Sequence, residues 1–145
     1  NGNYQEYVKT SAELLQEAKN NKIAEIKTAK EIDLYLNVSY NNKDFISSEK
    51  AVSNMTGAII LNQDSYNWLD VNGNPNIMTV NDLKGLVGII ATHRSLIYNK
   101  EGLKIKAVND AQTIEDINNI NWEDNLSLGL KTKRKIKTKT TIKSI

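Results

Sequence analysis

The chain has 145 residues, of which 39% are apolar and 25% are charged, with one proline and seven glycines. A chain of this length can bury roughly two thirds of its unfolded surface, so we expect one globular domain, or one domain with an extension. The absence of cysteine excludes disulfide scaffolds, cysteine zinc sites and thiol nucleophiles. The longest apolar runs, 57–61 and 85–91, are far shorter than the roughly 20 residues of a membrane-spanning helix, so we expect no membrane insertion. Because the chain begins with Asn1 rather than Met, we expect a processed or truncated piece.

The net charge of +2 is distributed unevenly along the chain. Residues 1–130 carry all 17 acidic residues and 12 basic ones, whereas residues 131–145 carry seven basic residues and no acid. The sequence therefore predicts an acidic body of net charge −5 followed by a basic extension. We expect three segments, namely a lead-in over 1–9, a folded domain over 10–124 and the basic extension over 125–145.

The first predicted element is a helix over about 10–31. Thr10 and Glu13 have the spacing of a capping box, in which each side chain satisfies an amide near the helix start. A kink or break is expected at Asn20–Asn21, because asparagine weakens the middle of a helix. The apolar residues that recur mostly at helical spacing are Val8, Ala12, Leu15, Ile23 and Ile26.

A β-hairpin is predicted next. Aromatic and β-branched residues indicate strands over 34–40 and 43–46. Asn41–Asn42 suits the tight turn between them, because asparagine tolerates positive φ better than most residues.

A second helix is predicted over 48–61, with Ser48 as its N-terminal cap. Gly57 is unfavourable inside a helix, so we expect a neighbouring element to approach closely there. One face of the helix carries Val52, Met55 and Ile59.

A second hairpin over 66–80 and a third helix over 80–111 complete the main elements. Asn72–Gly73 is a strong signal for a hairpin turn. Thr79 and Asp82 form a second capping pair at the start of the third helix. Its apolar stripe consists of Leu83, Leu86, Val87, Ile90 and Ile97.

These elements predict an α+β fold. A further short helical turn is expected after Thr113, whose hydroxyl is spaced to cap with Asp116. One option for the basic extension is a short C-terminal strand. The three main helices are thus expected at about 10–31, 48–61 and 80–111, and the two hairpins at about 34–46 and 66–80.

The residues that could carry chemistry favour structural interpretations. His93 is the only histidine, which excludes a two-histidine metal site within one chain, and its place on the apolar stripe favours a hydrogen-bonded structural role. The segment Asp70–Asn74 has alternating oxygen ligands, but its glycine and proline are misplaced for a calcium loop, so a hairpin turn is favoured. We expect no catalytic residue, metal or cofactor. A carboxylate-dependent hydrolase stays as a hypothesis, because the sequence does not exclude a pair of carboxylates. The candidate acids cluster around predicted helix ends, where acids are common as caps and as solubilising charge: Asp110, Glu115, Asp116, Glu123 and Asp124.

Two groups of residues are candidates for interaction. Trp68 and Trp122 are large aromatic residues that either form a recognition surface or pack in the core. The extension places lysines on alternate positions, which is typical either of a cationic strand or of a solvated terminus. The candidate interaction residues are Lys131, Lys133, Arg134, Lys135, Lys137, Lys139, Trp68 and Trp122.

Several motifs follow one another in a particular order over residues 10–122, namely Ser48 through Gly57–Ala58, the Trp68 strand with its turn, Met78 through Leu83, His93, Leu103–Lys104 and Ala111 through Ile117. This order resembles a module of unknown function in tail-fibre and tail-fibre-assembly proteins of bacteriophages and prophages. The basic extension lies outside the resemblance.

The resemblance implies a non-enzymatic structural role in the virion tail, or a role in fibre assembly in the cytoplasm of the bacterial host. The implied partners are tail-fibre or other tail proteins, or a receptor on the host surface, and we expect a homo-oligomer. The alternative is a protein that binds nucleic acid or another polyanion through the basic extension.

Overall fold

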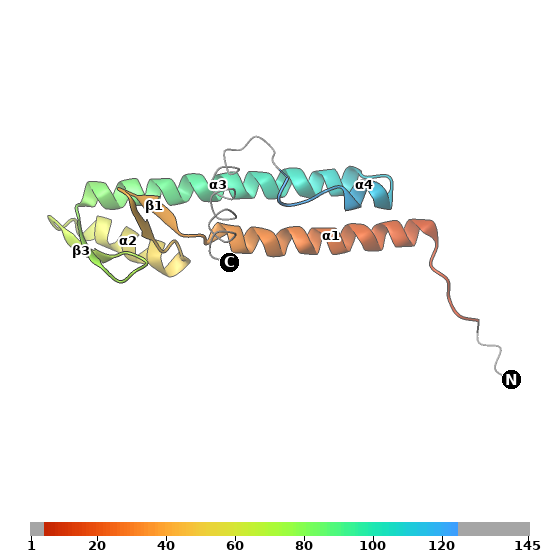
Figure 1. The fold of residues 1–145 in the computed structure, drawn as a ribbon, viewed down its shortest axis with the longest axis horizontal. Helices are drawn as coiled ribbons and strands as arrows, with labels where there is room; N and C mark the ends of the chain where they lie inside the picture. The colour runs from red at the N-terminus through yellow and green to blue at the C-terminus, as the bar shows by residue number, and fades with distance from the viewer. Residues whose placement is uncertain (1–4, 125–145) are drawn as a thin grey trace, which may run out of the picture. The chain divides into compact units, whose positions relative to one another are not determined.

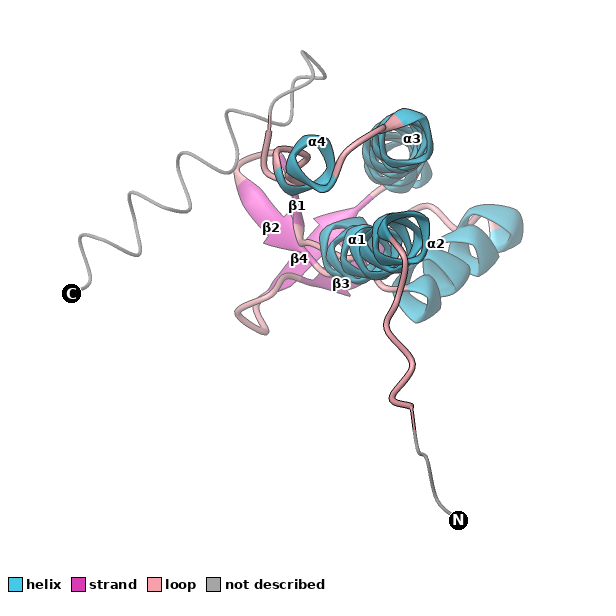
Figure 2. Cartoon of the chain, turned by 90° about the vertical axis from the view of Figure 1, so that its right-hand side faces the viewer, coloured by secondary structure: helices cyan, strands magenta, loops and turns pink. Residues whose placement is uncertain are grey.

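The computed structural model describes residues 5–124. The basic extension and its optional C-terminal strand lie outside these residues. The fold is α+β, as predicted, with four helices and two antiparallel hairpins in the described part (Figures 1 and 2). The elements are α1 (Ser11–Leu34), β1 (Val38–Tyr40), β2 (Lys43–Phe45), α2 (Glu49–Leu61), β3 (Tyr66–Leu69), β4 (Pro75–Met78), α3 (Val80–Asp110) and α4 (Ile114–Asn118).

Contacts within the chain divide it into two compact units. The helical unit has its described residues at 5–29 and 100–124, and the hairpin unit comprises residues 30–99. Both α1 and α3 contribute to each unit, because the boundaries fall inside these helices. No helix in the described ranges has the length and apolar character to span a membrane.

In the helical unit, α1, the last turns of α3 and α4 lie side by side (Figures 1 and 2). The ammonium group of Lys19 donates to the backbone carbonyl of Asn109 at 2.8 Å and so ties α1 to α3. Thr113 caps α4 as predicted, because its hydroxyl accepts from the amide of Asp116 at 3.0 Å.

The hairpin unit contains one apolar core, to which both hairpins, α2 and α3 contribute. Its helix faces agree with the predicted stripes, since Met55 of α2 and Leu83 and Leu86 of α3 are fully buried. The partly buried side chains of Tyr40 and Trp68 pack against this core. The core residues are Val38, Phe45, Met55, Ala58, Met78, Leu83, Leu86 and Ile90.

The two hairpin turns follow from local chemistry. Asn41 and Asn42 adopt φ values of 49° and 62°, which confirms the predicted turn between β1 and β2. In the second turn, Gly73 has a φ of 80°, a value that glycine adopts without the strain of a side chain. The carboxylate of Asp70 accepts from the backbone amides of Asn72 at 2.9 Å and Asn74 at 3.1 Å. Asp70 therefore shapes a hairpin turn, as the sequence favoured.

The start of α3 carries the predicted capping pair. The hydroxyl of Thr79 accepts from the amide of Asp82 at 3.1 Å, and the carboxylate of Asp82 accepts from the amide of Thr79 at 2.9 Å. The hydroxyl of Tyr40 also donates to Asp82 at 3.0 Å. The hydrogen bonds from Thr79, and then the one from Tyr40, hold the pKa of the Asp82 carboxyl below its usual value.

Three local expectations about α1 are wrong. The helix runs without a break through Asn20–Asn21, where the side-chain amide of Gln16 donates to the side-chain oxygen of Asn20 one turn later at 3.0 Å. It also extends to Leu34, which is 1% exposed, so the first strand begins at Val38 rather than at residue 34. Val8 precedes the helix and is exposed, so it is not part of the apolar stripe.

The close approach predicted at Gly57 is also wrong. A Cβ atom added there would meet no atom within 4 Å. The close approach lies instead at Gly85 in α3, where a Cβ would stand 3.0 Å from Cε2 of Tyr40. The sequence offers no signal for this difference, because the ring that contacts Gly85 comes from a strand 45 residues earlier.

Candidate functional site

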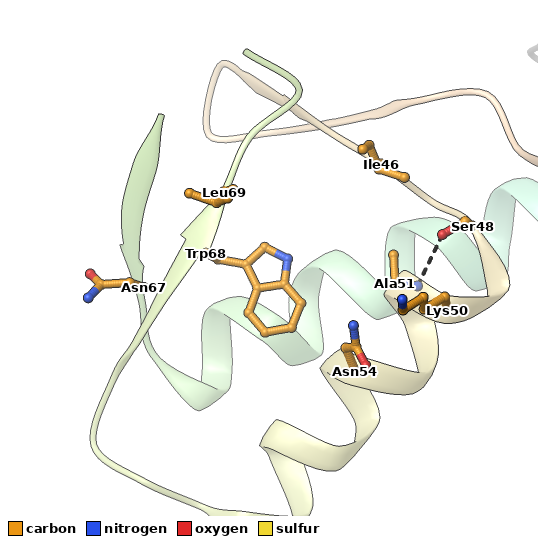
Figure 3. Close-up of a pocket in the computed structure, with 8 residues that line it drawn as sticks. All are labelled: Ile46, Ser48, Lys50, Ala51, Asn54, Asn67, Trp68 and Leu69. Carbon is orange, nitrogen blue, oxygen red and sulfur yellow. Dashed lines mark hydrogen bonds between the residues drawn. The ribbon is translucent and has the colours of Figure 1, made fainter. Parts of the chain in front are cut away.

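An open hollow of about 380 Å³ lies between β3 and the first turns of α2. We call it the Trp68 hollow. Figure 3 shows the indole ring of Trp68 on the side of β3 that faces α2, whereas Asn67 and Leu69 point away from it. This arrangement follows from the alternation of side chains along a strand. The residues that line the hollow are Ile46, Ser48, Lys50, Ala51, Asn54, Asn67, Trp68 and Leu69.

Trp68 is only half-buried. One part of its side chain packs against the core of the hairpin unit. Its backbone carbonyl accepts from the side-chain amide of Asn76 at 3.2 Å. Within residues 5–124, no hydrogen bond involves its indole N–H. The ring therefore presents both an apolar face and a donor that a ligand could use.

Ile46 forms the opposite border of the hollow and is 54% exposed. Its neighbours are fixed, because Phe45 is buried in the core and Ser47 donates its hydroxyl to the carbonyl of Leu36 at 2.7 Å. The guanidinium of Arg94 also donates to the carbonyl of Ser47 at 2.7 Å. With both neighbours held inward, the alternation of an extended chain directs Ile46 outward.

The rim of the hollow is polar. Ser48 caps α2 by accepting from the amide of Ala51 at 3.1 Å (Figure 3). Asn54 and Lys50 are exposed on α2, and Lys50 is the one charged residue among those that line the hollow. No ion pair joins Lys50 to another residue of the described range. An apolar centre with a polar rim is typical of protein interfaces.

The structure separates the two predicted tryptophan candidates. Trp68 lines the hollow, whereas Trp122 is 7% exposed in the helical unit. The ammonium group of Lys100 lies 4.2 Å from the ring centroid of Trp122, which is the geometry of a cation–π contact. This burial favours a packing role for Trp122. The basic candidates, which are Lys131, Lys133, Arg134, Lys135, Lys137 and Lys139, lie outside the described residues.

His93 has the structural role that its position indicated. It is 7% exposed, and its Nε2 atom lies 2.7 Å from the backbone carbonyl of Asp33. Because a carbonyl oxygen only accepts, Nε2 carries the hydrogen of this bond. The histidine thus ties the end of α1 to α3 inside the hairpin unit.

The acidic candidates take part in local contacts. Asp110 forms an ion pair with Lys106 one turn earlier in α3. Glu115 and Asp116 lie in the first turn of α4, where negative charge stabilises a helix. Among the residues that the structure describes, no group of three or more histidine or acidic side chains could hold a metal ion.

Asp70 is the one acidic side chain of the second turn, and it is 8% exposed. Burial raises the pKa of its carboxyl, but hydrogen bonds from Asn74, Asn76 and Asn72 act in the opposite direction, and the net pKa lies below the usual value. The carboxylate form is therefore used to hold the turn.

A second hollow, of about 350 Å³, lies in the helical unit between α1 and the start of α4. Neither a charged nor an aromatic side chain lines it. Its lining residues are Ser11, Ala12, Leu15, Gln112, Thr113 and Ile114. The Trp68 hollow offers more chemistry for recognition, since it combines an aromatic ring, a cation and a free N–H.

Most of the Trp68 hollow was not predicted from sequence. Only Trp68 was named as a candidate. The exposure of Ile46 follows from its place between Phe45 and Ser47, which the fold buries, and that burial is known only from the structure. Comparisons of the chain with protein-family models, with curated proteins and with solved structures found no match.

Proposed function

We propose that this chain is a non-enzymatic interaction module of a phage or prophage tail, either as part of the tail fibre or as a helper in its assembly. In this proposal the module binds a partner protein of the tail through the Trp68 hollow. The resemblance in motif order supports the tail assignment, and the Trp68 strand is one of its motifs. The observation that carries the binding role is the half-buried tryptophan with an exposed isoleucine beside it and a polar rim around both.

The composition of the hollow suits recognition of a protein. Tryptophan is enriched among the residues that dominate binding energy, especially where neighbouring contacts exclude water from it. Ile46 and Trp68 supply such a centre, and Ser48, Lys50 and Asn54 supply hydrogen-bonding groups around it. The hollow contains no paired carboxylates and no histidine among its lining residues, so acid–base chemistry has no basis there.

A pair of matched variants tests this proposal. Ile46→Asp places a charge in the hollow, whereas Ile77→Asp places the same charge on β4 outside it, and Ile77 is 76% exposed. We expect Ile46→Asp to weaken binding to the cognate tail protein by at least about tenfold, a loss typical of central interface residues. We expect Ile77→Asp to bind as the unmodified chain does.

The measurement is light scattering after size exclusion, followed by titration calorimetry, with purified tail proteins encoded beside this chain. Circular dichroism confirms that both variants are folded. A chain that ignores every neighbouring tail protein would contradict the proposal. Equal affinity of the two variants would remove the hollow from the binding surface.

A second candidate function is binding of nucleic acid or another polyanion by the basic extension. The observation in its favour is the run of seven basic residues without an acid in 131–145. With about six phosphate contacts, the logarithm of the affinity should fall with the logarithm of salt concentration at a slope of about −5. Unchanged DNA and RNA binding after deletion of 131–145 would refute this candidate.

A further inference from the structure

The edge of β3 that faces away from β4 borders the Trp68 hollow, and beyond Leu69 it ends where the amide of Val71 donates to the carbonyl of Asp44 in β2 at 2.9 Å. The hairpin is a two-stranded sheet, so β3 pairs with β4 on one side only. Three consecutive residues of β3, Asn67, Trp68 and Leu69, line the hollow. The strand edge and the hollow are therefore parts of one surface.

The pairing register identifies which backbone groups face this edge. The amide of Asp70 donates to the carbonyl of Asn74 at 3.0 Å, which makes these two residues a hydrogen-bonding pair. Such pairs alternate with non-bonding pairs in an antiparallel ladder. Asn67, opposite Ile77, and Leu69, opposite Pro75, are therefore non-bonding positions, and their N–H and C=O groups face away from β4.

These outward groups are available for pairing. Within the described range, no backbone bond outside the hairpin involves the N–H or C=O of Asn67 or Leu69. The edge of β4 is poorer, because its outward position 75 is a proline, which has no N–H. Of the two edges of this hairpin, the edge of β3 is the one that combines two unpaired N–H groups with an adjacent hollow.

We propose that the partner binds as an extended acidic segment that pairs with the open edge of β3 as a third strand. This inference rests on the proposed binding function of the Trp68 hollow and names the partner's chemistry. Backbone hydrogen bonds to Asn67 and Leu69 supply affinity, as in other cases of strand addition. Every second side chain of the segment faces the hollow, where an apolar residue covers Trp68 and Ile46 and an acidic residue two positions along meets Lys50.

Charge selects the acidic segment over a basic one. Lys50 is the charged residue of the hollow and has no ion pair within residues 5–124. The neighbouring acid, Glu49, accepts from the hydroxyl of Tyr35 at 2.9 Å. The chain's own basic segment, 131–143, has alternating residues suited to a strand, but its lysines would meet Lys50. Like charges placed together oppose binding.

Two synthetic peptides test the proposal on the full chain. One has valine and glutamate in turn at its hollow-facing positions and threonine between them (Val-Thr-Glu-Thr-Val-Thr-Glu-Thr), and the other has lysine in place of glutamate. We expect the glutamate peptide to bind more tightly, and to slow the hydrogen exchange of the Asn67 and Leu69 amides, measured by NMR. We expect the Lys50→Glu variant to reverse the preference between the peptides.

Proline variants test the backbone bonds separately. Asn67→Pro deletes an N–H at the open edge of β3, and Ile77→Pro deletes the N–H of the residue directly opposite, at the edge of β4. Loss of one backbone hydrogen bond corresponds to about a fivefold weakening. We therefore expect Asn67→Pro to weaken binding of the glutamate peptide at least about fivefold. We expect Ile77→Pro to leave the affinity for this peptide unchanged. The amide exchange of the unmodified chain is independent of how well either variant folds.

Each result has a distinct meaning. Binding without new protection of the Asn67 and Leu69 amides overturns strand addition, as does tighter binding of the lysine peptide. Slow exchange of these amides in the chain without peptide would assign the edge to the chain's own basic segment and would also overturn the proposal. If strand addition fails while Ile46→Asp still abolishes binding of the tail protein, the proposed function stands. If Ile46→Asp has no effect, the proposed function itself fails.

Discussion

Two glycines in α3 are expected to respond in opposite ways to the same substitution. A Cβ atom added at Gly88 would meet no atom within 4 Å, so alanine fits there without displacing a neighbour. Replacing glycine by alanine inside a helix stabilises it by about 0.5–1 kcal/mol, chiefly because glycine loses more backbone freedom on folding. For 145 residues, 1 kcal/mol corresponds to a rise in Tm of about 3 °C.

At Gly85 the same gain is opposed by the ring of Tyr40. A Cβ would lie 3.0 Å from Cε2, 3.2 Å from Oη and 3.4 Å from Cζ of that ring. The ring cannot move freely, because it packs against the core and its hydroxyl bonds Asp82. Overpacking of this kind costs about 1–3 kcal/mol. We therefore expect Gly85→Ala to be at least about 1 kcal/mol less stable than Gly88→Ala.

The assay is urea denaturation followed by circular dichroism, which gives the free energy of unfolding of each variant. The slope of this free energy against urea concentration is compared between variants, because a constant slope shows that the difference is one of stability. Both alanine substitutions are repeated in a Tyr40→Leu background, which removes the three ring atoms near Gly85. There we expect Gly85→Ala to recover the gain seen with Gly88→Ala, and this coupling is the sign of a direct contact. Equal stabilisation by the two substitutions in the unmodified chain would refute the reasoning.

Three further outcomes are expected from the described contacts. Met55→Ala should lower the free energy of unfolding by about 2–5 kcal/mol in urea denaturation, because Met55 is fully buried. Ile60→Ala should change this free energy by less than about 0.5 kcal/mol, because Ile60 is 76% exposed. His93→Leu should lower the free energy of unfolding by about 0.5–1.5 kcal/mol, because the carbonyl of Asp33 loses the 2.7 Å bond from His93 and retains the longer one from the amide of Leu36 at 3.4 Å. No loss in the same assay would contradict the structural role of His93. The folded-state pKa of Asp82 is lowered, so the contribution of this carboxylate to stability is present above the unfolded pKa of about 3.8 and is lost as the pH falls. Asp82→Asn should therefore reduce the acid dependence of Tm between pH 5 and 3. An unchanged dependence would argue against this contribution.

The elements fixed by local chemistry were predicted well. The turn at Asn41–Asn42, the cap by Ser48 and the capping pair of Thr79 with Asp82 each depend on residues close together in the chain. The end of α1 was predicted less well, because the aromatic and β-branched residues that follow Leu34 indicate a strand, whereas Leu34 itself continues the helix as part of the buried interior. Burial of that kind depends on residues distant in sequence.

The candidate site was mostly beyond prediction for the same reason. The Trp68 hollow combines residues from the segment before α2, from α2 itself and from β3. The sequence pattern indicates that Trp68 lies on one face of a strand whose side chains alternate between two faces. It does not indicate that Ile46 and Lys50 lie beside Trp68. The open edge of β3 also required the register, which the bond between Asp70 and Asn74 defines.

Pro75 has a consequence for how many copies of a segment one hairpin can recruit. A ribbon with two equally competent margins can extend in both directions, and repeated extension leads to fibrous aggregates. Here one margin retains both outward donors at Asn67 and Leu69, while the other lacks the donor at position 75. We therefore expect a stoichiometry of one segment per chain, bound along β3.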